Sequence, residues 1–335
     1  MEEAMLWEPL KNKKVQCYLC ARRCIIDESQ RGFCAVRENR RGKLYTLVFG
    51  KLTAVNVDPI EKKPFFHYYP GSKALSVATV GCNFRCDFCC NAALSQSTKI
   101  IGENYTPEQI VQLANEKGCK VIAYTYNEPT MQFEFAYKTG KLAHRYNIKN
   151  VFVTNGYMTE DAVKKISRIL DAAVVDVKAS LDPEFYLKHM GVPDVNPIYD
   201  CILQMKKQRI FLEITNLIVP QIGDDIERAS QLTEWIVNEL GADVPYHVLR
   251  FSPDYKLLQL PPTPVSTLER HIDTARRSGL RYVYIGNVWG HDNENTYCFN
   301  CGKLLIKRHG FFVEEINLVN NRCPACGFRI NVVIE

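Results

Sequence analysis

Residues 79–89 read TVGCNFRCDFC and follow an apolar run, 74–80, with the length and composition of a buried strand. The three cysteines, Cys82, Cys86 and Cys89, have C-x3-C-x2-C spacing, with an aromatic residue just before the last of them. Three thiolates at this spacing can hold three irons of a 4Fe–4S cubane and leave the fourth iron open to a substrate or cofactor. Zinc usually has four closed ligands in paired C-x2-C steps, which this triplet lacks. The spacing therefore predicts a reactive iron–sulfur cluster at the C-terminal end of a strand.

Length, net charge and cysteine content limit the class of protein. The chain has 335 residues, a formal net charge of +5 and 14 cysteines. So mild a charge permits an acidic or nucleic-acid partner without requiring one. The N-terminus has no basic-then-apolar signal pattern, and no apolar run approaches the roughly 20 residues that span a bilayer. We therefore expect a cytoplasmic protein with no membrane partner, whose cysteines bind metals rather than form disulfides.

The chain divides into three predicted segments: a cysteine-rich N-terminal region (1–73), a central domain (74–290) and a four-cysteine C-terminal module (291–335). The central domain alternates strand and helix patterns, which predicts an α/β fold with a parallel sheet. Six such units, with room for a seventh strand, fit a partial (β/α)6 TIM-type barrel, whose chemistry lies at the C-terminal strand ends. The predicted strands are 74–80, 120–124, 150–154, 173–178, 210–219, 246–250 and 281–285, and the predicted helices are 107–117, 131–146, 160–170, 225–240 and 266–278.

Polar residues gather where these strands end. The second strand is followed by Glu128 and Pro129. The third ends in Thr154-Asn155-Gly156, whose hydroxyl and amide can hydrogen-bond ribose hydroxyls or a carboxylate, although Asn-Gly is also a common turn. Since parallel strands end at one edge of a sheet, we expect these groups beside the cysteine triplet.

Charged residues on later strands extend this set, because a charge in an apolar strand is unfavourable unless it is paired or functional. Asp176 and Lys178 end the fourth strand, where a structural pair and a catalytic role fit the sequence equally well. Glu213 lies on the fifth strand, and Arg250 ends the sixth as a candidate contact for a carboxylate or phosphate. The predicted cofactor contacts are Glu128, Pro129, Thr154, Asn155, Gly156, Asp176, Lys178, Glu213 and Arg250.

The triplet and the motifs that follow it in order resemble the radical S-adenosylmethionine (SAM) superfamily. The resemblance implies a 4Fe–4S cluster and SAM as cofactors, and reductive cleavage of SAM to a 5′-deoxyadenosyl radical that abstracts hydrogen from a substrate. The cofactors carry the difficult step, and the protein orients them. It also implies an electron donor such as flavodoxin or ferredoxin. The substrate is unidentified, with a protein or an RNA among the candidates.

The order of the motifs and several longer segments indicate a narrower group within this superfamily. The motif order is similar to that of pyruvate formate-lyase activating enzymes, and the whole chain is similar to AmmeMemoRadiSam-system radical SAM enzymes, through residues 58–64, 81–86 and 253–256 among others. Radical SAM proteins bind the amino group of SAM with a Gly-Gly-Glu-Pro motif, in which a carboxylate and backbone carbonyls face the ammonium. Here Glu128-Pro129 matches that motif and Tyr126-Asn127 replaces its two glycines. Cys90 replaces a glutamine that usually follows the last cysteine in the AmmeMemoRadiSam group. Cys90 is a competing ligand, a hydrogen-atom donor or, as the ordinary expectation, a buried small residue.

Two further cysteine sets flank the central domain. The C-terminal set consists of two C-x2-C pairs, each followed by glycine, which predicts a zinc ribbon or rubredoxin-like knuckle, with mononuclear iron or a cluster as alternatives. The N-terminal set has C-x2-C-x3-C-x9-C spacing, for which zinc and an auxiliary 4Fe–4S cluster are equally good interpretations. The C-terminal residues are Cys298, Cys301, Cys323 and Cys326, and the N-terminal ones are Cys17, Cys20, Cys24 and Cys34.

The sequence thus predicts a radical SAM enzyme acting on an unidentified substrate. One alternative is an activase that acts on a glycyl-radical partner protein. Another is a non-enzymatic zinc or iron–sulfur protein that binds nucleic acid. The latter should carry basic clusters interleaved with aromatics, and Arg22-Arg23, Arg40-Arg41 and Lys206-Lys207 are too short for that.

Overall fold

The structure is a computed structural model that describes residues 2–334, and an eight-stranded sheet forms its centre. The strands are β8 (Ala54–Pro59), β9 (Lys73–Ala78), β11 (Val121–Tyr124), β12 (Lys149–Thr154), β13 (Ala172–Lys178), β14 (Phe211–Ile218), β15 (Tyr246–Arg250) and β16 (Val283–Gly286). Their order is β16-β15-β14-β13-β12-β11-β9-β8, and all are parallel except β8. Since no pairing joins β16 to β8 within residues 2–334, the sheet is open. The α/β class with a central parallel sheet is confirmed, and the curved barrel stays a prediction.

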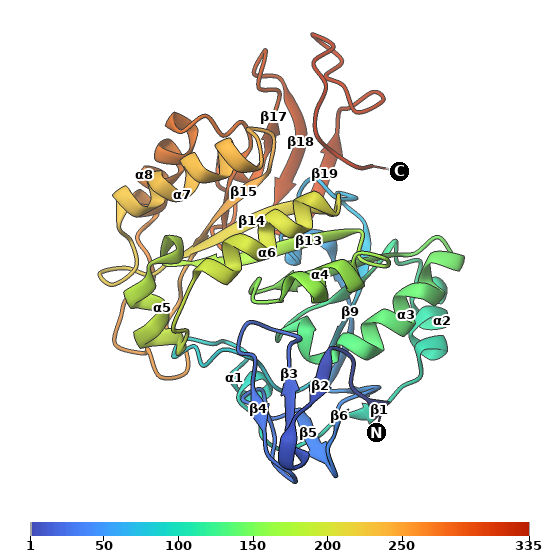
Figure 1. Ribbon diagram of the computed structural model, residues 1–335. Coiled ribbons are helices and arrows are strands. Elements are labelled where there is room, and N and C mark those ends of the chain that lie inside the picture. The colour runs from blue at the N-terminus through green and yellow to red at the C-terminus, as the bar shows by residue number, and fades with distance from the viewer. Residues whose placement is uncertain (1, 335) are drawn as a thin grey trace.

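Helices connect the parallel strands, and Figure 1 shows α3, α4 and α6 in front of the sheet. Thr106 and Thr159 begin two of them by accepting bonds from the backbone N–H groups of Gln109 and Ala162. The helices between β13 and β14 were not predicted. The helices are α1 (Ala92–Ser95), α2 (Pro107–Glu116), α3 (Phe133–Arg145), α4 (Glu160–Ile166), α5 (Pro183–Met190), α6 (Asn196–Lys207), α7 (Ile226–Glu239) and α8 (Val265–Arg277).

The N-terminal residues form small antiparallel sheets at the lower end of the molecule in Figure 1. One has the order β1-β6-β5 and another β2-β3-β4, while β7 pairs with β10. Arg37 on β5 forms a fully buried ion pair with Glu134 on α3, which joins this region to the central domain. The strands are β1 (Glu2–Glu3), β2 (Trp7–Pro9), β3 (Val15–Cys17), β4 (Ile25–Ile26), β5 (Arg37–Arg40), β6 (Lys43–Thr46), β7 (Lys51–Leu52) and β10 (Glu103–Asn104).

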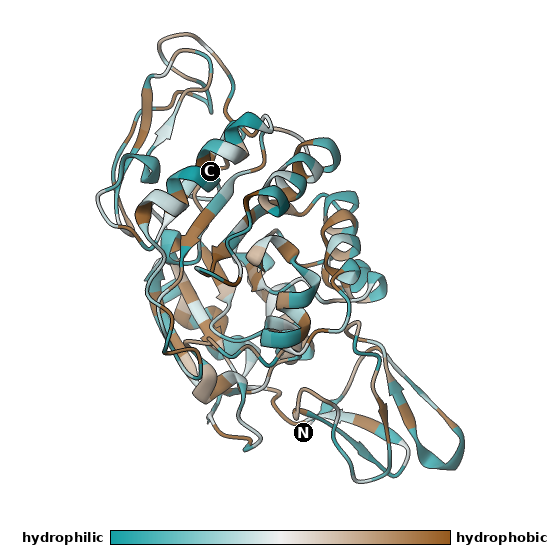
Figure 2. Cartoon of the chain, turned by 90° about the vertical axis from the view of Figure 1, so that its left-hand side faces the viewer, coloured by the Kyte–Doolittle hydropathy of each residue, from teal (hydrophilic) through white to brown (hydrophobic). Residues whose placement is uncertain are grey.

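The C-terminal module lies at the opposite, upper end, with β17 (Thr296–Tyr297), β18 (Leu304–His309) and β19 (Phe312–Ile316) in one antiparallel sheet. The chain then returns, so that Val333 pairs with Tyr68. Figure 2 shows hydrophobic residues along the central strands and polar residues on the outer sides of the helices. Among the described helices, none has the length and apolar character to cross a membrane.

Candidate functional site

A cavity of about 600 Å³ opens at the C-terminal ends of the first parallel strands, within the size range of small-molecule sites. Most of its polar groups follow the ends of four neighbouring strands, β9, β11, β12 and β13, and β14 to β16 also contribute to its lining. Five of the nine predicted cofactor contacts line it. Its polar and sulfur-bearing lining includes Cys82, Cys86, Cys89, Cys90, Asn91, Tyr126, Asn127, Glu128, Thr154, Asn155, Asp176 and Lys178.

The cysteine loop is held from both sides. Its backbone N–H groups at Arg85 and Asp87 donate to carbonyls at the end of α5, at 2.9 Å each. At its start Gly81 has φ +90°, and a Cβ there would lie 2.7 Å from the carbonyl oxygen of Cys34. Only glycine combines this backbone conformation with so close an approach.

The three sulfurs of this loop do not all lie within 4.8 Å of one another. Among residues 2–334, only the C-terminal cysteines bring three or more ligand atoms of His, Cys, Asp or Glu within 4.8 Å of one another. The triplet is therefore too open for a mononuclear site, and it suits the separate corners of a cubane. Burial raises the pKa of the Cys86 thiol to about 12, with nearby Lys178 opposing that rise. A bound metal cluster would offset this raised pKa, because coordination holds the sulfur as a thiolate.

Glu128 ties two strand ends together at the cavity wall. It is 2% exposed, and Oε1 accepts from the Thr154 hydroxyl at 2.8 Å and from Thr130. Oε2 accepts from the Asn155 N–H at 2.8 Å. Burial raises the pKa of Glu128, and these donors act against the rise. The carboxylate thus fixes the Thr-Asn-Gly turn as well as lining the cavity.

Asn155 links that turn to the cysteine loop. Its Nδ2 donates to Asn83 Oδ1 at 2.7 Å and lies 4.0 Å from the sulfur of Cys82. On the opposite side, Asn127 donates to the carbonyl of Gly81 at 2.9 Å. Asn155, which the sequence predicted beside the cysteine triplet, and Asn127, which it did not, therefore both orient the cysteine loop.

Tyr126 has a φ of +66°, a backbone conformation that favours glycine, which is the residue that the motif it resembles has at this position. Its hydroxyl donates to Asp58 at 2.5 Å, and the ammonium of Lys63 lies 2.8 Å from the same carboxylate and 4.1 Å from the tyrosine ring. Burial alone would raise the pKa of Asp58, but Lys63, Tyr126 and Lys62 hold it below its usual range. Lys62 and Lys63 also line the cavity, and no pattern in the sequence indicates this.

Asp176 and Lys178 form an ion pair of 2.5 Å on the cavity wall. Asp176 also accepts from the Thr215 hydroxyl at 2.7 Å. Although burial lowers the pKa of Lys178, attraction to Asp176 outweighs it and raises that pKa. The pair is thus preformed in the cavity, whichever of its two predicted roles it has.

Glu213 does not reach this cavity. It is fully buried, and its oxygens accept from the backbone N–H groups of Phe66 and His67 at 3.0 and 2.8 Å. His247 lies 2.8 Å from the same carboxylate. These contacts bind the 60–71 segment to the sheet, and they leave no oxygen free for a cofactor.

The other predicted contacts also lie behind the cavity wall. Arg250 donates from Nε to the carbonyl of Thr263 at 3.0 Å. Pro129 is buried at the start of a short 3-10 helix, Pro129–Gln132. Gly156 has φ +71°, and a Cβ there would lie 2.8 Å from Val175. Pro129 and Gly156 therefore shape the strand ends, and Arg250 holds a loop.

Cys90 is exposed and lines the cavity, so the expectation of a buried small residue is wrong. The cause is local: the chain turns outward after Cys89, and the short helix α1 begins at Ala92. Asn91 then donates to the carbonyl of Tyr126 at 2.7 Å across the cavity mouth.

A second cavity of about 200 Å³ adjoins the first and shares lining residues with it, including Asp176. It lies between the sheet and the C-terminal module, and its far wall carries Phe66, Trp289, Phe311 and Glu61. Oε2 of buried Glu61 has no partner among the described residues. Burial raises the pKa of Glu61 to about 7, with Arg308 opposing the rise.

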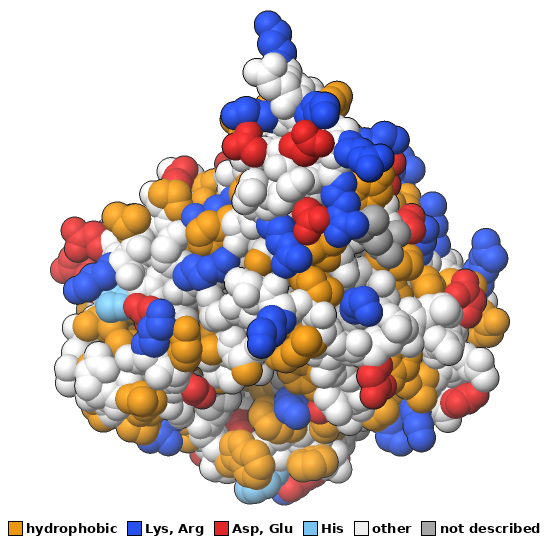
Figure 3. Space-filling model, turned by 90° about the horizontal axis from the view of Figure 1, so that it is seen from below, with side chains coloured by type: hydrophobic (Ala, Val, Ile, Leu, Met, Phe, Trp, Pro, Cys, Tyr) orange, Lys and Arg blue, Asp and Glu red, His pale blue; other side chains and the backbone are white. Residues whose placement is uncertain are grey.

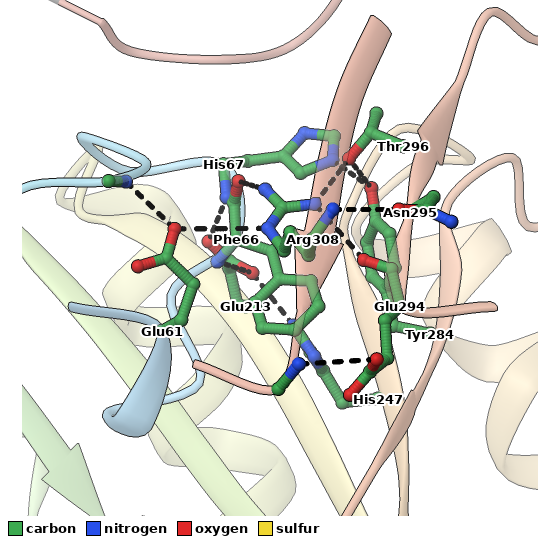
Figure 4. Close-up of polar contacts among 12 residues, drawn as sticks. Glu61, Phe66, His67, Glu213, His247, Tyr284, Glu294, Asn295, Thr296 and Arg308 are labelled. Carbon is green, nitrogen blue, oxygen red and sulfur yellow. Dashed lines mark hydrogen bonds and ion pairs between the residues drawn. The ribbon is translucent and has the colours of Figure 1, made fainter. Parts of the chain in front are cut away.

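Figure 4 shows the network behind this second cavity. Arg308, on β18, donates to the carbonyl of Phe66 at 2.7 Å and lies 3.8 Å from Glu61. Nε2 of His67 lies 2.5 Å from the hydroxyl of Tyr284. The network joins residues more than 200 positions apart, so no local pattern in the sequence could have revealed it.

The C-terminal cysteines form a compact tetrathiolate. The sulfurs of Cys298 and Cys326 are 3.6 Å apart, as are those of Cys301 and Cys323. This geometry suits one metal ion held by four thiolates.

Comparison with known proteins agrees with the site. A family model described as the Radical SAM superfamily matches residues 76–236. The uncharacterized protein MJ0808 of Methanocaldococcus jannaschii is 45% identical over 338 residues, covering 100% of both chains. MJ1632 of the same organism, which carries the name "Putative glycyl-radical enzyme activating enzyme", is 26% identical over 186 residues, 53% of this chain and 67% of its own. The crystal structure of a radical SAM methyltransferase from Sphaerobacter thermophilus is similar in fold, with a TM-score of 0.53 at 14% identity over 70% of this chain and 71% of that one.

The chain belongs to the radical SAM superfamily. Within it, the chain is related to glycyl-radical enzyme activating enzymes. Membership implies a 4Fe–4S cluster and SAM, for which the open cysteine triplet and the adjoining cavity are suited.

Proposed function

We propose that this chain is an enzyme that uses SAM and a cluster on Cys82, Cys86 and Cys89 to abstract hydrogen from a substrate in the second cavity. When bound, the reduced cluster and SAM supply a 5′-deoxyadenosyl radical. The observation that carries the proposal is one cavity lined by all three cysteines and by polar groups from the neighbouring strand ends. A reduced one-electron carrier of the flavodoxin or ferredoxin class is the proposed partner.

The chain's own residues divide the work of holding SAM. Thr154 and Asn155 offer a hydroxyl and an amide, and the Asp176–Lys178 pair offers both charges on the adjacent strand, β13. Glu128 keeps the Thr-Asn turn in place. No general base is required, because a hydrogen atom leaves the substrate as one particle and no side chain of the cavity has to accept a proton.

The second cavity is the proposed substrate chamber, because it adjoins the first at Asp176. Its aromatic wall of Phe66, Trp289 and Phe311 suits a group with an apolar body.

Glycyl-radical activation is the second candidate, favoured by the relationship to activating enzymes. It requires a partner's backbone loop, rather than a free small molecule, to reach the chamber. Nucleic-acid binding without catalysis is less well supported. On the face in Figure 3, Lys and Arg side chains are interspersed with Asp and Glu. For the C-terminal cysteines we propose zinc.

The test is an anaerobic assay of 5′-deoxyadenosine from SAM, with dithionite as reductant and iron and sulfide reconstituted. We expect product from the wild type and a loss of at least about 100-fold in Cys86→Ser. The matched control is Cys119→Ser, a buried cysteine outside all three sets. A wild type that holds its cluster but forms no 5′-deoxyadenosine would overturn the proposal.

A further inference from the structure

The four N-terminal cysteines surround one small cavity of their own. Cys17, Cys20, Cys24 and Cys34 all line it. Three of the four are buried, and Cys24 is half-buried. The remaining walls are largely apolar, formed by Leu19, Ile26, Phe33 and Met131.

The spacing of these sulfurs excludes a preformed mononuclear site. Four thiolates at about 2.3 Å from one zinc ion lie about 3.8 Å apart. The C-terminal sulfurs meet this condition, with pairs at 3.6 Å. Within residues 2–334, no three of the N-terminal ligands lie within 4.8 Å of one another, although all four face one cavity. In this respect the N-terminal set matches the cysteine triplet of the SAM site.

The loop spacings agree. The N-terminal set runs C-x2-C-x3-C and the SAM triplet runs C-x3-C-x2-C, so both use the same two steps. We propose that Cys17, Cys20, Cys24 and Cys34 bind a second 4Fe–4S cluster. Since four thiolates cover all four irons, this cluster has no open position and serves electron transfer rather than substrate binding.

The second cluster would lie directly beside the SAM site. Asn83, the neighbour of Cys82, lines the N-terminal cavity, and its carbonyl accepts from Nε of Arg22 at 3.0 Å. Its Oδ1 accepts from Asn155 in the SAM cavity at 2.7 Å. The carbonyl of Cys34 is so near Gly81 that a Cβ there would lie 2.7 Å away. One layer of residues therefore separates the two sites.

A buried guanidinium tunes the proposed cluster. Nη1 of Arg37 donates to the sulfur of Cys17 at 3.5 Å and to the carbonyl of Met5 at 2.8 Å. Its charge is balanced by Glu134, with which it pairs away from solvent. Hydrogen bonds from a cation to a ligand sulfur favour the reduced form of a cluster.

This arrangement assigns the second cluster to electron delivery, a role that rests on the proposed function. A reduced one-electron carrier reduces the second cluster, which passes that electron to the cluster on Cys82, Cys86 and Cys89. Each transfer oxidises one centre by one electron and reduces the next by one electron. No bond forms or breaks, and no proton moves.

The existence of the cluster can be tested without SAM chemistry. In the full chain carrying Cys82→Ala, Cys86→Ala and Cys89→Ala, we expect about four iron and four sulfide per chain. Its reduced form should give an electron paramagnetic resonance signal that SAM leaves unchanged. Adding Cys20→Ala and Cys34→Ala should remove that iron. Should the triple variant not fold, Cys20→Ala/Cys34→Ala in the wild-type background should fall from about eight iron to about four. Retention of all the iron, or zinc in its place, would overturn the proposal.

Electron delivery needs a second readout. With a reduced ferredoxin or flavodoxin as donor, Cys20→Ala/Cys34→Ala should form 5′-deoxyadenosine at least about tenfold more slowly than wild type. With dithionite, which reaches the SAM cluster as a small molecule, the loss should be less than about twofold. Equal losses with both donors would contradict the delivery role. Failure of the wild type with dithionite would contradict the proposed function instead, and the iron count would then decide whether the second cluster exists.

Discussion

The two four-cysteine sets have the same ligands and lie at opposite ends of the molecule, yet they hold their sulfurs differently. At the C-terminus, Gly302 and Gly327 both have φ +71°, and each donates to a cysteine carbonyl at 2.8 Å, so two like turns bring the sulfurs together. At the N-terminus, one cysteine ends β3, two flank the turn before β4 and one lies in the loop before β5, and together they surround an apolar cavity. The two sets therefore match in the number of cysteines and differ in how closely their sulfurs lie, and this difference is the basis for proposing a different metal group at each end.

The largest expected contrast is in how far the local stability of the C-terminal module, compared with the central sheet, depends on a bound metal. Two of the four C-terminal cysteines, Cys301 and Cys326, are exposed, so we expect a chelator to remove the proposed metal and to loosen the two cysteine turns. Amide hydrogen exchange there should rise by at least about 100-fold, with β12 to β14 unchanged. Equal exchange with and without the metal would show that this module is held by its other contacts alone.

The next contrast is the buried pair Arg37–Glu134 of the N-terminal region. Arg37→Leu should lower the free energy of unfolding by about 4 kcal/mol, because it leaves a buried carboxylate unpaired. The double variant Arg37→Leu/Glu134→Leu should recover most of that loss. Urea unfolding at equal metal content measures both. If the double variant were as unstable as the single one, packing rather than charge would be the cause.

Buried Glu61, which contacts Arg308 of the C-terminal module, should make the free energy of unfolding depend on pH. In the unfolded chain this carboxyl titrates near its ordinary pKa of about 4.3, whereas burial raises its pKa in the native state to about 7. The native state then binds a proton that the unfolded state has lost, so stability should fall by about 3 kcal/mol as pH rises between these values. Glu61→Gln should remove that fall, and Glu116→Gln on the surface should not. Urea unfolding from pH 4 to pH 8 measures it, and an unaltered slope in Glu61→Gln would refute the assignment.

The smallest effect is expected at an exposed pair in the C-terminal module. Lys307 and Glu314 are 2.8 Å apart, but their side chains are 51% and 45% exposed. Water screens such pairs, so Lys307→Ala should leave the unfolding midpoint unchanged within error. If Lys307→Ala lowered the stability as much as Arg37→Leu does, burial would not explain why the two ion pairs differ in their contribution to stability.

Sequence patterns predicted the parallel strands and the starts of α2 and α4, because apolar runs and N-caps are local signals. They missed α5, although Asp182 caps it with Pro183 at its first position, the same signal as Thr106-Pro107. At the site they found the groups that follow strand ends. They misplaced Glu213, because alternation along a strand gives its face but not the 60–71 segment that binds it. The spacing of sulfurs from separate turns is a tertiary property, so it could not be read from cysteine intervals.

The most direct test of the account is the metal and sulfide content of the wild-type chain, purified and reconstituted without oxygen. An active cluster, a second cluster and a compact tetrathiolate together predict about eight iron, about eight sulfide and about one zinc per chain. About four iron, four sulfide and two zinc would show that the N-terminal cysteines close around a single ion, and would contradict the distinction between the two ends.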